Sequence, residues 1–249
     1  MSKKSRVYRS LYRLIRYPLE ALMVALVFVI FYFLPVDASS RLGGILSRWI
    51  GPRLGYQKWA ITSLSKAFPN LNGKQIKEIT DGMWDNLGRV LGELPHLKKI
   101  TRERVKISNE EILTSLTVNG GPCIFFTGHF GNWELLALTA QRLNTPYLQV
   151  YREANNPVVN LMLKKIRGLR NSEIISKGPE GAKEVIQALK SDSRLGIMAD
   201  LKMNDGIPVE LFGRKAMTAP AVAKLSMRYK CPAIPCLLYT SPSPRDQRG

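Results

Sequence analysis

Histidines, cysteines and acidic residues are all scarce in this chain of 249 residues. It has 2 histidines and 3 cysteines, and only 19 acidic residues against 37 lysines and arginines, which gives a formal net charge of +18. Cys123, Cys231 and Cys236 have neither the spacing of metal ligands nor the even number of a disulfide framework. We therefore expect reduced thiols in a cytosol-facing protein. The basic excess predicts an anionic partner: nucleic acid, anionic lipid or an acidic protein.

Several well-known motifs are also missing. The chain has no G-x-S-x-G nucleophile elbow, no Walker phosphate loop and no dinucleotide-binding fingerprint. It also lacks interleaved aromatic residues on a recognisable nucleic-acid module, which disfavours nucleic acid as the anionic partner. Apolar residues make up 45% of the chain, so a full core can be buried and the composition is not that of a disordered protein.

The first forty residues combine a basic segment with an apolar run. Six lysines and arginines and no acid precede residue 17, and residues 21–34 carry no charge. A signal peptide, a buried core helix and a membrane anchor all fit this pattern. We favour an anchor, because the bulky stretch FYFLPVD offers no small-residue cleavage site. At about 1.5 Å per residue the run reaches ~24 Å, short of the ~30 Å hydrocarbon core. Tyr17, Tyr32 and Trp49 suit the membrane interface, so the basic residues are expected to face anionic lipid.

After the first forty residues, the apolar residues first have helical spacing, and predicted strands and helices then alternate. Apolar residues in 74–93 recur as on one face of a helix, which should end before Pro95, and His96 is interpreted as a surface or packing histidine. We expect strands at 122–127, 145–151, 172–176, 195–200, 207–213 and 231–235, and helices at 131–143, 156–169, 180–191 and 218–229. This order predicts an α/β fold with a largely parallel sheet, helices on both faces, and ligands at the carboxyl ends of the strands.

These patterns divide the chain into four regions. Residues 1–40 form the basic N-terminus and hydrophobic membrane anchor, 41–100 a juxtamembrane helical region, 101–235 the α/β domain, and 236–249 a tail. The tail clusters Pro, Ser and Arg without periodicity, and it resembles the translation of a sequencing transposase adapter. We expect it to be non-native, with the α/β domain incomplete at its C-terminus; a genuine disordered tail is the alternative.

The segment TGHFGNWELL (127–136) contains the candidate chemistry. On one helix His129 and Glu134 would lie ~140° apart, so they can cooperate only if His129 is in a loop and Glu134 in the first helical turn. Gly128 and Gly131 permit such a loop, and Asn132 can serve the helix start. A carboxylate bound to one imidazole nitrogen leaves the other nitrogen as a base for a hydroxyl. A packing or turn histidine is the alternative, whereas a metal site is disfavoured because no further histidine is close.

TGHFGNWE resembles the H-x4-D/E motif of membrane acyltransferases, and this version is similar to the bacterial lipid A biosynthesis late acyltransferases (lauroyl and myristoyl transferases). Further familial segments are AFPNL (67–71), MWDNLGRVLGE (83–93), VYREANNP (150–157) and the block at 199–235. Together they cover nearly everything before residue 236. The chain departs from the family pattern at Leu201, where glutamine is usual, and at Glu210-Leu211, where an apolar pair is expected.

The resemblance implies an acyltransferase of lipopolysaccharide biosynthesis. Acyl-carrier protein would donate the acyl group, and a hydroxyl of a 3-hydroxyacyl chain on a Kdo-bearing lipid A precursor, an anionic glycolipid, would accept it. His129 would remove the hydroxyl proton, Glu134 would orient His129, and Arg167 would offset the negative oxygen. No cofactor, no metal and no nucleic-acid partner is implied.

Three further residues are candidates for substrate binding. Arg152 would bind a phosphate or sugar acid, Asp200 a basic side chain or substrate hydroxyl, and Asn132 would shape the loop or contact substrate. The alternatives are an ion pair near Glu153 for Arg152, a loop cap for Asp200, and a solvated helix face for Arg167.

Two other functions stay open. One is acyl transfer to another membrane lipid, such as a lysophospholipid, aminolipid or mannolipid. The other is a non-catalytic, basic membrane-binding protein.

The charge distribution also bears on location. Six basic residues before the apolar run predict a cytoplasmic N-terminus, so a full span would place the α/β domain outside. Acyl-carrier protein is cytoplasmic, and basic residues follow the run as well. We therefore predict a partly inserted anchor in the bacterial inner membrane, with the α/β domain on the cytoplasmic face.

Overall fold

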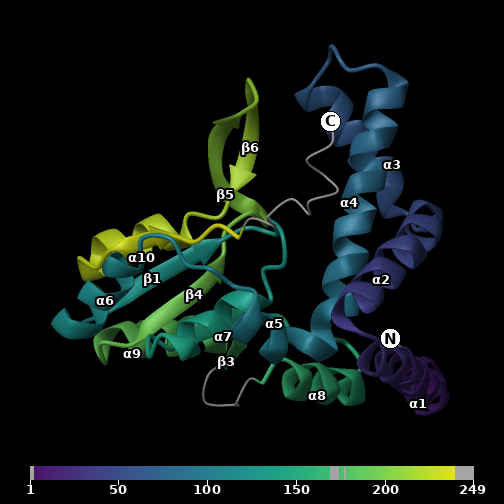
Figure 1. Ribbon diagram of the computed structural model, residues 1–249, viewed down its shortest axis with the longest axis horizontal. Coiled ribbons are helices and arrows are strands. Elements are labelled where there is room, and N and C mark those ends of the chain that lie inside the picture. The colour runs from purple at the N-terminus through teal and green to yellow at the C-terminus, as the bar shows by residue number, and fades with distance from the viewer. Residues whose placement is uncertain (1–2, 169–173, 177, 239–249) are drawn as a thin grey trace.

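The computed structural model describes residues 3–168, 174–176 and 178–238, and divides into a helical part and an α/β part (Figure 1). The helical part contains α1 (Lys3–Phe33), α2 (Val36–Ile50), η1 (Gly51–Arg53), α3 (Tyr56–Ala67), α4 (Gly73–Glu93), η2 (Leu94–His96) and α5 (Leu97–Glu103). The expected helix at 74–93 is confirmed as α4. Its first turn is held by a reciprocal capping box between Asn72 and Gln75.

The α/β part has a five-stranded parallel sheet in the order β3-β2-β4-β1-β7. Its strands are β1 (Cys123–Thr127), β2 (Leu148–Tyr151), β3 (Ile174–Ser176), β4 (Arg194–Met198) and β7 (Ala233–Pro235), and its helices are α6 (Glu110–Asn119), α7 (Leu135–Arg142), α8 (Pro157–Ile166), α9 (Pro179–Lys190) and α10 (Ala221–Tyr229). The α/β prediction with a largely parallel sheet is therefore confirmed.

One apolar cluster joins the sheet to its helices, and another joins α7 to the helical part. On one face, Ile124 and Leu195 pack with Val185 and Leu189 of α9 and with partly buried side chains of α10. A second cluster joins Leu135 and Leu138 of α7 to Leu94 and Leu97 of the helical part. Helix α7 thus packs on the helical part, and the loop that precedes α7 lies where the two parts of the molecule meet.

The expected strand at 207–213 lies outside the parallel sheet. It forms part of β5 (Lys202–Leu211), which pairs antiparallel with β6 (Arg214–Thr218) in a separate two-stranded sheet. Phe212 and Gly213, both with positive φ, make the two-residue turn between them. Such a turn lets a strand pair with the segment that follows it in the chain. The alternation of strands and helices along the sequence does not show whether a strand forms such a hairpin or joins the larger sheet.

The helix expected at 131–143 begins later, at Leu135. Gly131 has a φ of 54°, outside the helical region, and the side chain of Asn132 accepts a hydrogen bond from the backbone N–H of Glu134 at 3.2 Å. These two features extend the loop to Glu134, which lies immediately before the first helical residue.

Helices α2 and α4 are in backbone contact, and this contact supports the α7 loop. A Cβ atom at Gly88 would lie 2.1 Å from the carbonyl oxygen of Gly43, so neither helix tolerates a side chain there. Ser40 donates to one oxygen of Glu93 at 2.7 Å, and Asn132 donates to the other at 2.6 Å. The end of α4 therefore holds the loop in place through partly buried hydrogen bonds.

Helix α1 packs against the α/β part along one side only. The amide of Asn156, the residue that caps α8, donates to the carbonyl of Tyr17 at 2.9 Å and to Glu20 at 3.2 Å. His96 Nε2 bonds the carbonyl of Phe31 at 2.9 Å, as suits a packing histidine. Within the described residues, 14–33 is the one helical segment long and apolar enough to cross a membrane, and most of it is exposed. This exposure disfavours a buried core helix.

The predicted division at residues 40, 100 and 235 stays a prediction. The first residues of the predicted tail continue the fold: the backbone N–H of Cys236 donates to Phe126 at 2.8 Å, and Leu238 packs on the cluster around α7. Residues 239–249 lie outside the described residues.

Candidate active site

The parallel register of β1 and β4 places His129 beside Asp200. Thr127 and Met198, the last residues of the two strands, are partners in the register. The backbone N–H of Ala199 donates to the carbonyl of Thr127 at 2.8 Å, which extends the pairing by one step. His129 and Asp200 each lie two residues beyond their strand, at the edge of the sheet where ligands of such folds bind.

Asp200 holds His129 through both its backbone and its ring. The backbone N–H of His129 donates to Asp200 Oδ2 at 2.7 Å, and ring Nδ1 lies 2.9 Å from Oδ1. Because an ionised carboxylate only accepts, Nδ1 carries the hydrogen in this bond, and the lone pair on Nε2 can accept a proton. The Trp133 ring packs edge-on against the imidazole at 4.8 Å between centroids.

The two side chains shift each other's pKa in opposite directions. The hydrogen bond to Asp200 raises the pKa of His129 above its ordinary value, against burial, and the charges of Asp200 and Glu134 act in the same direction. Burial disfavours ionised Asp200, but the hydrogen bonds from the ring and backbone of His129 outweigh burial and lower its pKa. The pair therefore favours a proton on His129 and a charge on Asp200.

Glu134 is paired with Arg167. Arg167 lies directly after α8, and its Nε and Nη2 donate to the two oxygens of Glu134, each at 2.6 Å. Its Nη1 donates to the hydroxyl of Tyr151 at 3.1 Å, and that hydroxyl donates to Asn160 at 3.1 Å. Glu134 is thus one end of a hydrogen-bonded chain that joins the α7 loop, α8 and the end of β2.

The bidentate pair is largely shielded from water. The side chains of Arg167 and Glu134 are 17% and 9% exposed. Burial disfavours the charged guanidinium, but the bonds to Glu134 outweigh it, and the pKa of Arg167 is raised. A guanidinium has five N–H groups, so the three bonds to described residues leave one N–H on each terminal nitrogen for a further acceptor.

The other sequence candidates have different surroundings. Asn132 is buried, and its amide group bonds Glu93 and the backbone of Glu134, so its position suits a residue that shapes the loop. Arg152 is exposed just beyond the end of β2. A contact between either residue and substrate stays a prediction.

The role of Glu93 is not apparent from the sequence. Glu93 is the last residue of α4, and its carboxylate joins Ser40 of α2 to Asn132 of the loop. Its place in MWDNLGRVLGE was the available signal, but nothing in that segment indicates which distant side chain the carboxylate would meet.

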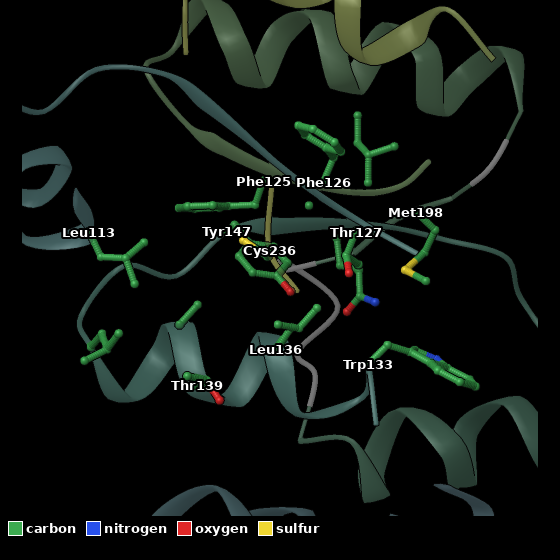
Figure 2. Close-up of a pocket in the computed structure, with 15 residues that line it drawn as sticks. Leu113, Phe125, Phe126, Thr127, Trp133, Leu136, Thr139, Tyr147, Met198 and Cys236 are labelled. Carbon is green, nitrogen blue, oxygen red and sulfur yellow. The ribbon is translucent and has the colours of Figure 1, made fainter. Parts of the chain in front are cut away.

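An apolar cavity lies between the sheet and α7, and its lining includes Trp133, which packs against His129 (Figure 2). The empty space within it is about 620 Å³, which includes space open to solvent. Thr127, Trp133 and Met198, which neighbour the His129–Asp200 pair, line one side in Figure 2, and Leu113 lies on the opposite side. Most of the lining side chains are apolar, so the space suits an apolar group.

The thiols do not provide a second nucleophile. Burial raises the pKa of Cys123 and of Cys236, which lines the cavity, to about 11 in each case. All three cysteines are free, as expected. Because the thiolate is the reactive form, burial makes Cys123 and Cys236 poor nucleophiles at neutral pH.

The candidate site thus combines a histidine with an available ring nitrogen, a nearby apolar cavity and the carboxyl edge of a parallel sheet. The profile of the bacterial lipid A biosynthesis acyltransferases matches residues 8–244. The chain therefore belongs to this family, as its sequence motifs indicated, and it is an enzyme that transfers acyl groups. A comparison with individually curated proteins gives no match. The family and the exposed apolar helix together indicate association with a membrane.

Proposed function

We propose that this enzyme transfers an acyl chain from acyl-carrier protein to a hydroxyl of a 3-hydroxyacyl chain on a Kdo-bearing lipid A precursor. The observation that carries the proposal is that His129, with Nε2 available as a base, packs against Trp133, which lines an apolar cavity. The cavity supports an acyl group as the transferred unit, and the basic surface of the chain suits an acidic donor protein and an anionic acceptor.

In the proposed reaction His129 Nε2 takes the proton of the acceptor hydroxyl as the oxygen attacks the thioester carbonyl. A tetrahedral intermediate forms with its negative charge on the former carbonyl oxygen. The carbon–sulfur bond then breaks, and the leaving thiolate takes the proton from His129. The products are an ester on the acceptor and the free thiol of the carrier, and no cofactor or metal takes part.

Arg167 and Glu134 assist the charged steps. The two unused N–H groups of Arg167 are the donors we assign to the negative oxygen, an interaction worth about 2.7–4 kcal/mol for one donor in other enzymes. Glu134 contributes the H-x4-E carboxylate, whose charge favours a protonated His129. Arg152, exposed beyond β2, is assigned to an acidic group of the acceptor.

We place the catalytic part on the cytoplasmic face of the inner membrane, with α1 partly inserted. Asn156 and His96 bond the backbone of α1 near both ends of its apolar segment. If α1 crossed the bilayer, these contacts would draw α8 and η2 into the hydrocarbon. Burial of only the exposed side of α1 avoids this cost. A reporter fused after residue 60 should be active in the cytoplasm, and a periplasmic signal would contradict the placement.

The acceptor is tested by offering acyl-carrier-protein thioester with three lipids: a Kdo-bearing lipid A precursor, its 3-deoxyacyl analogue and a lysophospholipid. Mass spectrometry should show one added acyl chain on the first lipid and none on the analogue, which lacks the attacking hydroxyl. Acylation of the lysophospholipid alone would replace the proposed acceptor with another membrane lipid.

A further inference from the structure

The site contains two carboxylates, and they have different partners. Asp200 bonds the ring and the backbone of His129, whereas both oxygens of Glu134 are bonded by Arg167. The described structure contains no hydrogen bond between Glu134 and His129. Sequence spacing alone pairs His129 with Glu134, because the two are near neighbours in the chain.

We propose that Asp200 is the positioning residue that orients the base His129, and that Glu134 acts mainly by holding Arg167 beside the reacting centre. This division of roles rests on the proposed acyl transfer. Asp200 acts through His129, and Glu134 acts through Arg167.

The geometry at Asp200 meets the requirements for orienting a base. One oxygen bonds Nδ1 at 2.9 Å while the other bonds the backbone N–H of the same residue at 2.7 Å, so the carboxylate fixes the ring relative to its own main chain. A Cβ at position 128 would lie 3.1 Å from Asp200 Oδ2 and 2.5 Å from the Phe130 ring. Gly128 thus leaves room for the carboxylate to reach the loop.

The geometry at Glu134 meets a different requirement. A carboxylate whose two oxygens receive parallel bonds from one guanidinium is fixed in that plane. Reorienting Glu134 toward His129 would leave Arg167, which is 17% exposed, without its charged partner. The bond from Arg167 to Tyr151, itself bonded to Asn160, holds the guanidinium on its other side.

The first test measures the titration of the imidazole in protein labelled at histidine. The chain has 2 histidines, so His96→Ala assigns both signals. The charged groups acting on His129 are Asp200, through contact, and Glu134, which is paired with Arg167. We expect Asp200→Asn to lower the pKa of His129 more than Glu134→Gln does, with the exposed Asp205→Asn as the control. A larger shift in Glu134→Gln, or none in Asp200→Asn, would overturn the proposal.

The second test is a double-mutant cycle on the rate of acyl transfer. Asp200→Asn should lower the rate about 100-fold, because the base His129 loses the group that orients it, and by the same factor in an Arg167→Met background. Glu134→Gln should lower the rate of the parent, but in the Arg167→Met background its effect should stay within about twofold. If Glu134 oriented His129 directly, its substitution would remain costly without Arg167.

The two tests separate this proposal from the proposed function. The histidine titration needs no substrate, so it decides which carboxylate acts on His129 even if the acceptor is another lipid. Conversely, if the rate of acyl transfer depends on His129 but does not change in Asp200→Asn, the proposed function is upheld and the positioning role of Asp200 is rejected.

Discussion

The two ion pairs of the site differ mainly in their access to water. The side chains of His129 and Asp200 are 41% and 34% exposed, whereas those of Arg167 and Glu134 are 17% and 9% exposed. A base must meet its substrate and exchange protons, so the first pair has to be open. A guanidinium that supplies fixed charge works best where water is excluded. Under the proposed function, exposure more than charge therefore distinguishes the reacting pair, His129 and Asp200, from the supporting pair, Arg167 and Glu134.

The largest expected effect of this difference is on stability. Glu134→Ala leaves the charge of Arg167 largely buried without a partner and should lower the free energy of unfolding by about 3–5 kcal/mol. Asp200→Ala, at the exposed pair, should cost about 1 kcal/mol or less. Chemical denaturation of both variants in the same detergent measures the difference.

A double variant sharpens this prediction. Glu134→Met with Arg167→Met removes both charges and should recover much of the lost stability, because a buried pair replaced by apolar groups is often neutral. Equal costs for Glu134→Ala and Asp200→Ala would show that the two pairs are not distinguished by burial.

A smaller effect is expected where the cavity meets the sheet. A Cβ at Gly196 would lie 2.1 Å from the ring of Tyr147, and both residues line the cavity. Gly196→Val should cost about 1–3 kcal/mol through overpacking and shift the products toward shorter acyl chains. Products from a mixture of acyl donors can be compared by mass spectrometry, with Gly55→Val, where nothing lies nearby, as the control. Unchanged chain lengths would argue that the acyl group binds elsewhere.

The smallest expected effect is a displacement of the pH profile. His129 must be neutral to act as a base, and its pKa is raised, so activity should fall as the pH falls through that raised value. Asp200→Asn removes the main cause of the shift, so the acid limb of the remaining activity should move to lower pH. Rates measured across that limb for the parent and the variant test this. Displacement of the acid limb to higher pH would contradict the conclusion that Asp200 raises the pKa of His129.

The sequence predicted the elements of the fold well because its apolar periods are clear. Helix α4 and the alternating strands and helices from Cys123 onward follow the expected order, and the chain belongs to the family that its motifs resembled. The strand expected at 207–213 falls largely within β5, but its pairing with β6 in a separate hairpin was not predicted, since a strand's partner is set by its turn and by tertiary packing.

The residues of the site could be found from the sequence, but their pairing could not. His129 and Asp200 are 71 positions apart. They meet only because β1 pairs with β4 and not with β2, the next strand in the sequence. Arg167 was identified through resemblance, and its partner Glu134 lies 33 positions away on another element. Spacing along the chain suggests neighbours within a few residues, whereas strand order decides these contacts.

The most direct measurement of the central claim is acyl transfer by the two single-histidine variants. With acyl-carrier-protein donor and Kdo-bearing acceptor, His129→Ala should lower the rate about 10²–10⁴-fold through loss of the base. His96→Ala, whose ring bonds the carbonyl of Phe31 on α1, should retain the chemical step. Undiminished transfer by His129→Ala would contradict the account.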